Sequence, residues 1–184
     1  MKAMSRPTHR VAFAFHRGPL GRSGRCVYRR ADHALVYEAD AIAPNLSVPR
    51  TLTDEIDDRL SIRHAPPSFY VVADTLTLVF TGDPYTLVSF DAYTNERLWA
   101  PHDQPFAPSL NGEGDLRLVT GPDDVGHAAL AVHPHYETVP DRSCVRIILS
   151  NKPAEGRYLV GRDLVIGLRD AAITEIVMLN VRFE

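Results

Sequence analysis

The stretch FYVVADTLTLVFTGDPYTLVSF, residues 69–90, carries the clearest structural signal in this chain of 184 residues. Its first two segments, 69–72 and 76–80, are rich in β-branched and aromatic residues, which favour strands. The turn-forming residues 81–84 follow, and residues 85–90 supply a returning strand, as in a hairpin with a four-residue connection. The stretch therefore predicts antiparallel β-structure.

A similar stretch lies near the C-terminus. Residues 164–168 and 173–181 predict a second hairpin, although the apolar spacing also fits a helix over residues 162–172. The two stretches align at a constant offset of 88 residues, which places Tyr70-Val71-Val72 on Tyr158-Leu159-Val160. The alignment suggests two duplicated three-strand units, at residues 60–93 and 148–181.

Weaker signals complete the predicted fold. Capping residues and acidic first turns predict one helix from Thr51 or Thr53 to Leu60, and another from Pro122 to Val132. Prolines and glycines predict breaks in regular structure, among them residues 111–114. Further strands are expected at residues 11–15, 26–29, 34–38, 116–119 and 145–149.

These elements predict an α+β fold that is mainly antiparallel β, arranged as a sandwich or partly open barrel with one or two short helices. We expect one domain over residues 1–184, because neither side of the strongest candidate boundary, residues 100–115, forms an obvious independent unit. Apolar residues make up 45% of the chain and charged residues 23%, which is ordinary globular composition.

The sequence contains no membrane or secretion signal. Its longest apolar runs, 11–15 and 128–132, are much shorter than the roughly 20 residues of a membrane-spanning helix. A cytoplasmic location is therefore expected. Cys26 and Cys144 lack the spacing of a zinc or redox motif, so we expect reduced thiols, with a long-range disulfide as the alternative.

Charge is divided sharply along the chain. Residues 1–31 have a formal charge of +8, whereas the remainder holds all 23 acidic residues. Such an arm can bind a polyanion or pair with the protein's own acidic body, and we expect the second. Nucleic-acid binding is not expected, because interleaved aromatic residues and a recognition motif are missing. The arm contains Lys2, Arg6, Arg10, Arg17, Arg22, Arg25, Arg29 and Arg30.

A cluster at residues 133–137 is the strongest candidate for chemistry. On a strand, His133, His135 and Glu137 share one face and offer two imidazoles and a carboxylate to a divalent metal. The set resembles the metal motif of the cupin family, in which an HxH pair precedes a carboxylate and a distant histidine. Here Glu137 follows His135 too soon and no later histidine occurs. The alternative is a loop of solvated histidines with Glu137 as a local ion partner.

Three aromatic residues near the proline-rich loop, Tyr93, Trp99 and Phe106, are candidates for a recognition patch, unless they cap a sheet. Neither a GxSxG motif nor an activated cysteine is present. We therefore expect a non-enzymatic, soluble binding module without a cofactor. It would be a bacterial accessory, regulatory or immunity-type protein that engages a macromolecular partner, namely another protein.

The alternative function is a small metal-dependent enzyme with one divalent ion at His133, His135 and Glu137. Metal analysis of the purified protein separates the two interpretations. One stoichiometric ion supports the enzyme.

Overall fold

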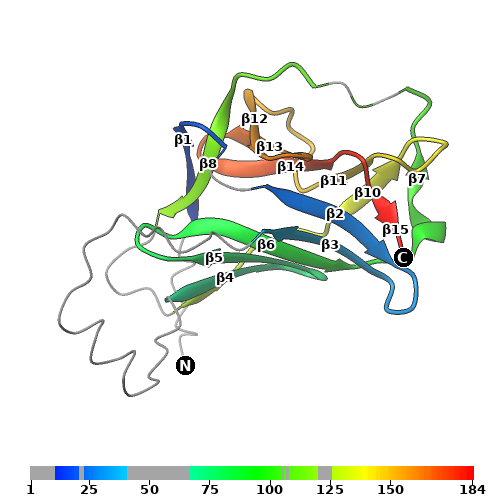
Figure 1. The fold of residues 1–184 in the computed structure, drawn as a ribbon, viewed down its shortest axis with the longest axis horizontal. Coiled ribbons are helices and arrows are strands. Elements are labelled where there is room, and N and C mark those ends of the chain that lie inside the picture. The colour runs from blue at the N-terminus through cyan, green and yellow to red at the C-terminus, as the bar shows by residue number, and fades with distance from the viewer. Residues whose placement is uncertain (1–10, 21–22, 41–66, 105, 107, 120–125) are drawn as a thin grey trace, which may run out of the picture.

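The computed structural model describes residues 11–20, 23–40, 67–104, 106, 108–119 and 126–184 (Figure 1). Strands hold 58% of these residues, which confirms the β-rich class. The elements are β1 (Ala12–Arg17), β2 (Gly24–Arg29), β3 (Ala34–Ala39), β4 (Ser68–Ala73), β5 (Leu76–Thr81), β6 (Thr86–Tyr93), η1 (Glu96–Leu98), β7 (Ala100–Pro101), β8 (Gly112–Val119), β9 (His127–Ala129), β10 (His135–Thr138), β11 (Val145–Ile148), β12 (Gly156–Gly161), β13 (Leu164–Arg169), β14 (Ala172–Met178) and β15 (Arg182–Phe183).

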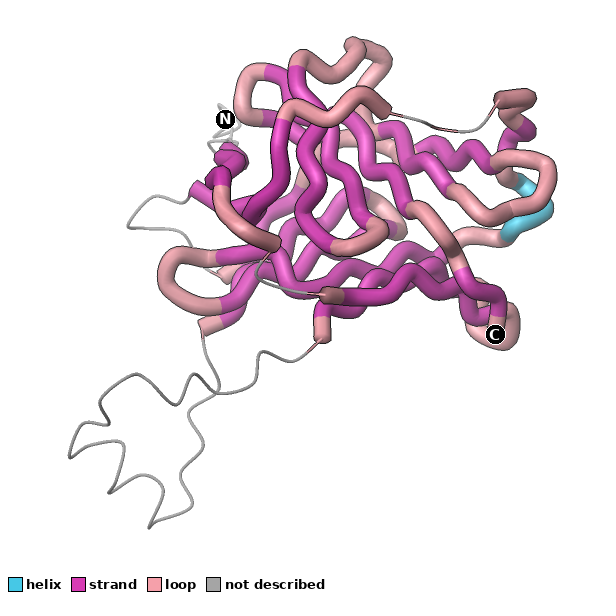
Figure 2. Tube along the Cα trace, turned by 45° about the horizontal axis from the view of Figure 1, so that its top comes forward, coloured by secondary structure: helices cyan, strands magenta, loops and turns pink. Residues whose placement is uncertain are grey.

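The strands lie in two layers, which are visible from both directions of view (Figures 1 and 2). The lower layer has the order β15-β2-β3-β6-β5-β4-β9, and the upper layer has the order β12-β13-β14-β11-β10-β7. Strand β8 joins them, because it pairs with β6 at Thr86↔Arg117 and with β12 at Tyr158↔Gly112. Strand β1 pairs with β8 along its whole length.

The sheet is mixed, and its path does not close. Among the described strands, ten pairings are antiparallel and four are parallel. The path ends at β15 and β7, which do not pair with each other. The structure therefore confirms the general part of the expected fold class, which is a strand-rich fold with many antiparallel pairs.

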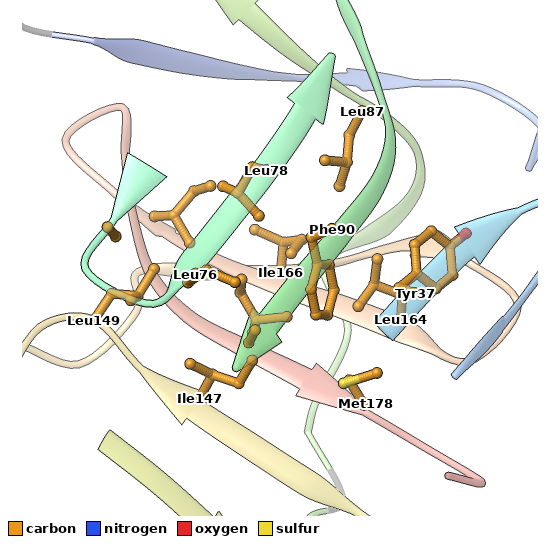
Figure 3. Close-up of a cluster of buried hydrophobic side chains, with 14 of the residues drawn as sticks. Tyr37, Leu76, Leu78, Leu87, Phe90, Ile147, Leu149, Leu164, Ile166 and Met178 are labelled. Atoms are coloured by element: carbon orange, nitrogen blue, oxygen red, sulfur yellow. The ribbon is translucent and has the colours of Figure 1, made fainter. Parts of the chain in front are cut away.

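The core lies between the two layers (Figure 3). Leu78 and Phe90 of the lower layer contribute to the same buried cluster as Ile147, Ile166 and Met178 of the upper layer, and none of these side chains is more than 1% exposed. Alternation along each strand causes this arrangement, since successive side chains of a strand point to opposite faces. Burial of such a side chain stabilises the fold by about 1.5–3 kcal/mol.

Both predicted hairpins are present. Strands β4 and β5 recur, 88 residues later, as β12 and β13 with the same bounds. In the pairing of β5 with β6, the register shifts between Val79 and Phe80. In the pairing of β13 with β14, it shifts at the equivalent place, between Gly167 and Leu168. Strands β12 and β13 thus repeat the order and bounds of β4 and β5, and the alternative helix over residues 162–172 is wrong.

The predicted helices are not found in the described part of the chain, where η1 is the one helical element and has three residues. The helix from Thr51 or Thr53 to Leu60 lies outside the described residues. The helix from Pro122 to Val132 is wrong over residues 127–129, which form β9 beside β4. Gly126 has φ +52°, which a right-handed helix does not allow, and Leu130 N–H donates to the Val72 carbonyl instead.

The break predicted at residues 111–114 is also wrong, because β8 begins at Gly112 and continues through Gly114. Glycine is required at position 114 by the close approach of β1. A Cβ atom there would lie 2.1 Å from the His16 carbonyl oxygen, and φ is +154°. Glycine in a strand often marks such an approach rather than a break.

Candidate functional site

A pocket of about 290 Å³ lies on the outer side of the upper layer and is lined in part by described residues between β7 and β8. Figure 1 shows the described part of this connection above the upper layer. The pocket brings together side chains from that connection and from three strands, β11, β12 and β14. The lining residues are His102, Phe106, Pro108, Ser109, Arg146, Arg157, Glu175 and Val177.

The pocket contains a buried carboxylate held by two arginines. The Glu175 side chain is only 4% exposed. Arg146 Nε and Nη2 lie 2.7 and 2.6 Å from Glu175 Oε2, and Arg157 Nε donates to Glu175 Oε1 at 2.5 Å. A buried charge is tolerated when it is paired and hydrogen-bonded, and both carboxylate oxygens meet this condition.

The strand register explains how these residues meet. On β14, Ile176 faces the core, so its neighbour Glu175 faces outward. Across the sheet, Glu175 lies opposite Gly167 of β13, and Gly167 lies opposite Arg157 of β12. A Cβ atom on Gly167 would lie 2.5 Å from Glu175 Cγ and 2.9 Å from Ala154 Cβ. The missing side chain at position 167 therefore lets Arg157 reach Glu175 across the middle strand.

A second carboxylate extends this network. Glu137 of β10 lies directly opposite Arg146 of β11, and its Oε2 is 3.4 Å from Arg146 Nη1. Glu137 does not line the pocket. Arg146 thus links an outer carboxylate to the buried one, and this fixes its guanidinium plane.

The opposite wall of the pocket is aromatic. His102 Nδ1 lies 2.8 Å from the Gln104 carbonyl oxygen and 3.4 Å from the Gln104 backbone nitrogen. The backbone N–H of His102 donates to the Thr138 carbonyl at 2.8 Å. The Phe106 ring lies 4.6 Å from the His102 ring. Backbone and side-chain bonds therefore hold this wall against the strands.

Asn111 fixes the backbone of Arg157 from the other end of the connection. Its Oδ1 accepts from Arg157 N–H at 2.8 Å, and its own N–H donates to the Arg157 carbonyl at 2.7 Å. Arg17 Nη2 donates to the Asn111 carbonyl at 2.9 Å. The position of Arg157 is therefore set by its backbone as well as by Glu175.

The three predicted recognition aromatics do not form one patch. Phe106 lines the pocket described above, whereas Tyr93 is 60% exposed and lines a different pocket on β3 and β6. Trp99 is buried, donates from Nε1 to Thr94 Oγ1 at 3.0 Å, and packs edge-on against Tyr28 at 4.9 Å between ring centroids. Trp99 is thus part of the core.

Two of the three predicted metal ligands have other partners. His133 Nδ1 lies 3.1 Å from Asp74 Oδ2, and Glu137 pairs with Arg146. His135 is exposed on β10. Within the described ranges, no group of three or more histidine, cysteine, aspartate or glutamate side chains could hold a metal ion.

The described part of the basic arm contacts the acidic body. Arg25 and Arg29 both pair with Glu38, at 3.4 and 3.1 Å. Arg30 Nε lies 3.5 Å from Glu96 Oε1. These exposed pairs are worth little individually, since solvent screens them. Other possible partners of the arm, at residues 54–58, lie outside the described residues.

Sequence reasoning missed the Arg146, Arg157 and Glu175 network. One signal was available, because Glu175 and Arg146 are the single charged residues of their mostly apolar strands. Buried charges of this kind are rarely unpaired. Their partner could not be named, because the contact depends on the register of four strands.

No described helix is long and apolar enough to cross a membrane. No protein-family model matches the sequence, and no curated protein matches it.

Proposed function

We propose that this protein is a non-enzymatic binding module that holds a segment of a protein partner in the pocket of the upper layer. The observation that carries the proposal is the buried Glu175 carboxylate, which Arg146 and Arg157 hold from two sides within an open pocket. Charged side chains that pair with one another provide a rigid, preorganised surface, and such a surface favours the binding of a partner.

The dimensions of the pocket support a macromolecular partner. Its volume of about 290 Å³ is at the lower limit of pockets that enclose small-molecule ligands, roughly 300–1,000 Å³. A cavity of this size accommodates one side chain of a partner segment. The rest of that segment would lie outside, over exposed residues such as Leu110.

The composition of the wall is also typical of recognition surfaces. Phe106, Pro108 and Val177 provide apolar contact beside the two arginines. Aromatic residues and arginine are the residue types that most often dominate the energetics of protein interfaces. The pocket thus combines an apolar anchor site with fixed hydrogen-bond donors.

A peptide selection tests the proposal. A random-peptide phage library is selected on the wild-type protein, and the recovered peptides are measured by fluorescence anisotropy. We expect peptides that bind the wild type and lose at least about tenfold in affinity to the Ser109→Trp variant, in which the indole fills the pocket. The matched control is Leu98→Trp, because Leu98 is 81% exposed on η1 and does not line the pocket.

Two results would contradict the proposal. Selection without any recovered binder argues against a peptide-binding function. Peptides that bind Ser109→Trp as tightly as the wild type place recognition on another surface.

A further inference from the structure

The geometry points to a carboxylate as the group that this pocket recognises, namely the side chain of an aspartate or glutamate in the partner segment. The inference rests on the proposed function for the identity of the partner, but the chemistry of the pocket carries it independently.

The charge of the lining is the first argument. Arg146, Arg157 and Glu175 together carry one net positive charge at the pocket wall. Glu137, which pairs with Arg146, belongs to β10 and is not among the lining residues. Glu137 therefore balances Arg146 from outside the lining, while two guanidinium groups and one carboxylate face the pocket, and this arrangement favours an anionic group there.

The donors of Arg157 are the second argument. Its Nε and its backbone groups are used by Glu175 and Asn111. Within the described residues, no hydrogen bond or ion pair engages its Nη1 or Nη2. The guanidinium group of arginine presents these two nitrogens as a planar fork that matches the two oxygens of a carboxylate. Glu175 therefore orients the fork of Arg157 without occupying it.

The apolar wall provides the third argument. Phe106 and Val177 would contact the methylene groups of an acidic side chain while its carboxylate meets Arg157. The Arg157 side chain is 32% exposed, so a group that enters from solvent can reach it.

Titration with a simple carboxylate tests the inference on the full chain. The probe is hippurate, which combines a carboxylate with an aromatic ring, and the comparison is its neutral amide, hippuramide. We expect hippurate to shift the Nε–H resonance of Arg157 saturably in ¹⁵N-edited NMR spectra. Hippuramide should bind at least about tenfold more weakly.

Variants separate recognition from folding. Arg157→Lys keeps the positive charge beside Glu175 but loses the fork, so it should fold and bind hippurate several-fold more weakly. The matched control is Arg162→Gln, because Arg162 is an exposed arginine in the turn between β12 and β13, and this variant should bind like the wild type.

The inference fails if hippuramide binds as tightly as hippurate, or if Arg157→Lys binds like the wild type. It also fails if inorganic phosphate displaces hippurate at lower concentration than acetate does, since the site then prefers a phosphate. Failure of the proposed function is distinct. If selected peptides occupy the pocket without an acidic residue, only the inference of a carboxylate ligand is contradicted. If hippurate binds but no peptide is selected, only the proposal of a protein partner is contradicted.

Discussion

The units β4–β5–β6 and β12–β13–β14 follow the same path, yet their outer faces carry different chemistry. In the first unit, one outward row across the three strands consists of Tyr70, Val79 and Ser89. In the second unit, the row through Gly167, the residue that aligns with Val79, consists of Arg157, Gly167 and Glu175, because the pairing registers of the two units differ. Tyr70 is 45% exposed, whereas Glu175 is buried.

The residue of the middle strand accounts for the difference. In the first unit, the middle position of the row carries the Val79 side chain, between Tyr70 and Ser89. In the second unit, Gly167 has no side chain, so the long Arg157 side chain reaches Glu175 over the strand. A similar strand arrangement thus carries either an outer face without an ion network or a buried ion network, depending on the residue at the middle position of the row.

The substitution Gly167→Val places in the second unit the residue type that the first unit has at the equivalent middle position. We expect it to change the free energy of unfolding more than any other substitution proposed below. The new side chain would overlap Glu175 Cγ and Ala154 Cβ and separate the ion pair. Overpacking and loss of a buried pair together should lower the free energy of unfolding by about 3 kcal/mol or more. Urea denaturation measures this loss. The reciprocal change, Val79→Gly, should cost about 1 kcal/mol, and equal costs for both would refute the comparison.

Glu175→Gln keeps the shape of the buried side chain but removes its charge. Arg146 and Arg157 then face each other without the carboxylate between them. Because both arginines are partly exposed and regain some hydration, we expect a loss of about 2 kcal/mol in the free energy of unfolding. Ser89→Ala, at the position that pairs with the middle residue Val79 in the first unit, should change this quantity by less than about 0.5 kcal/mol. A similar cost at both positions would show that the network adds no stability.

Alkaline pH tests the contact between the second unit and the lower layer. Cys26 Sγ of β2 lies 3.4 Å from the Asp163 carbonyl in the turn between β12 and β13, and burial raises the pKa of this thiol from 9.0 to about 12. Since the unfolded chain loses this proton first, the free energy of unfolding should fall as pH rises above 9.0, by up to about 1.4 kcal/mol per pH unit. Denaturation across this range, with Cys26→Ala as reference, isolates the effect. Parallel curves for the two proteins would show that the thiol does not contribute.

Tyr70→Gln should have the smallest effect. The Tyr70 side chain is exposed, and the hydrogen bonds of its backbone do not depend on the ring. The free energy of unfolding should change by less than about 0.5 kcal/mol in thermal or urea denaturation. A loss above about 1 kcal/mol would mean that the outer face of the first unit is covered as tightly as that of the second.

The strands were predictable and the pocket was not, for related reasons. The alternation in residues 69–90 is local, so each segment indicates its own buried face. Contact between Arg157 and Glu175 depends instead on two strand pairings and on the register shift after Gly167. A slip of one residue would turn either side chain to the other face.

Errors in the prediction occurred where a tertiary partner overrode a local preference. The glycines of β8 were interpreted as a break, although they permit the approach of β1. The segment that forms β9 has the composition of a helix, but β4 provides its backbone partners. Neither partner is visible in the local sequence.

The pairing of β15 with β2 has a consequence for the order of folding. Arg182 pairs with Val27, so nearly the whole described chain must be in place before this edge forms. Closing so long a loop is entropically slow, whereas the two hairpins close over short turns. Trp99, the single tryptophan, lies 6.4 Å from the Phe183 ring of β15. We therefore expect the tryptophan fluorescence of a refolding sample to reach its native value after the far-ultraviolet circular dichroism signal does.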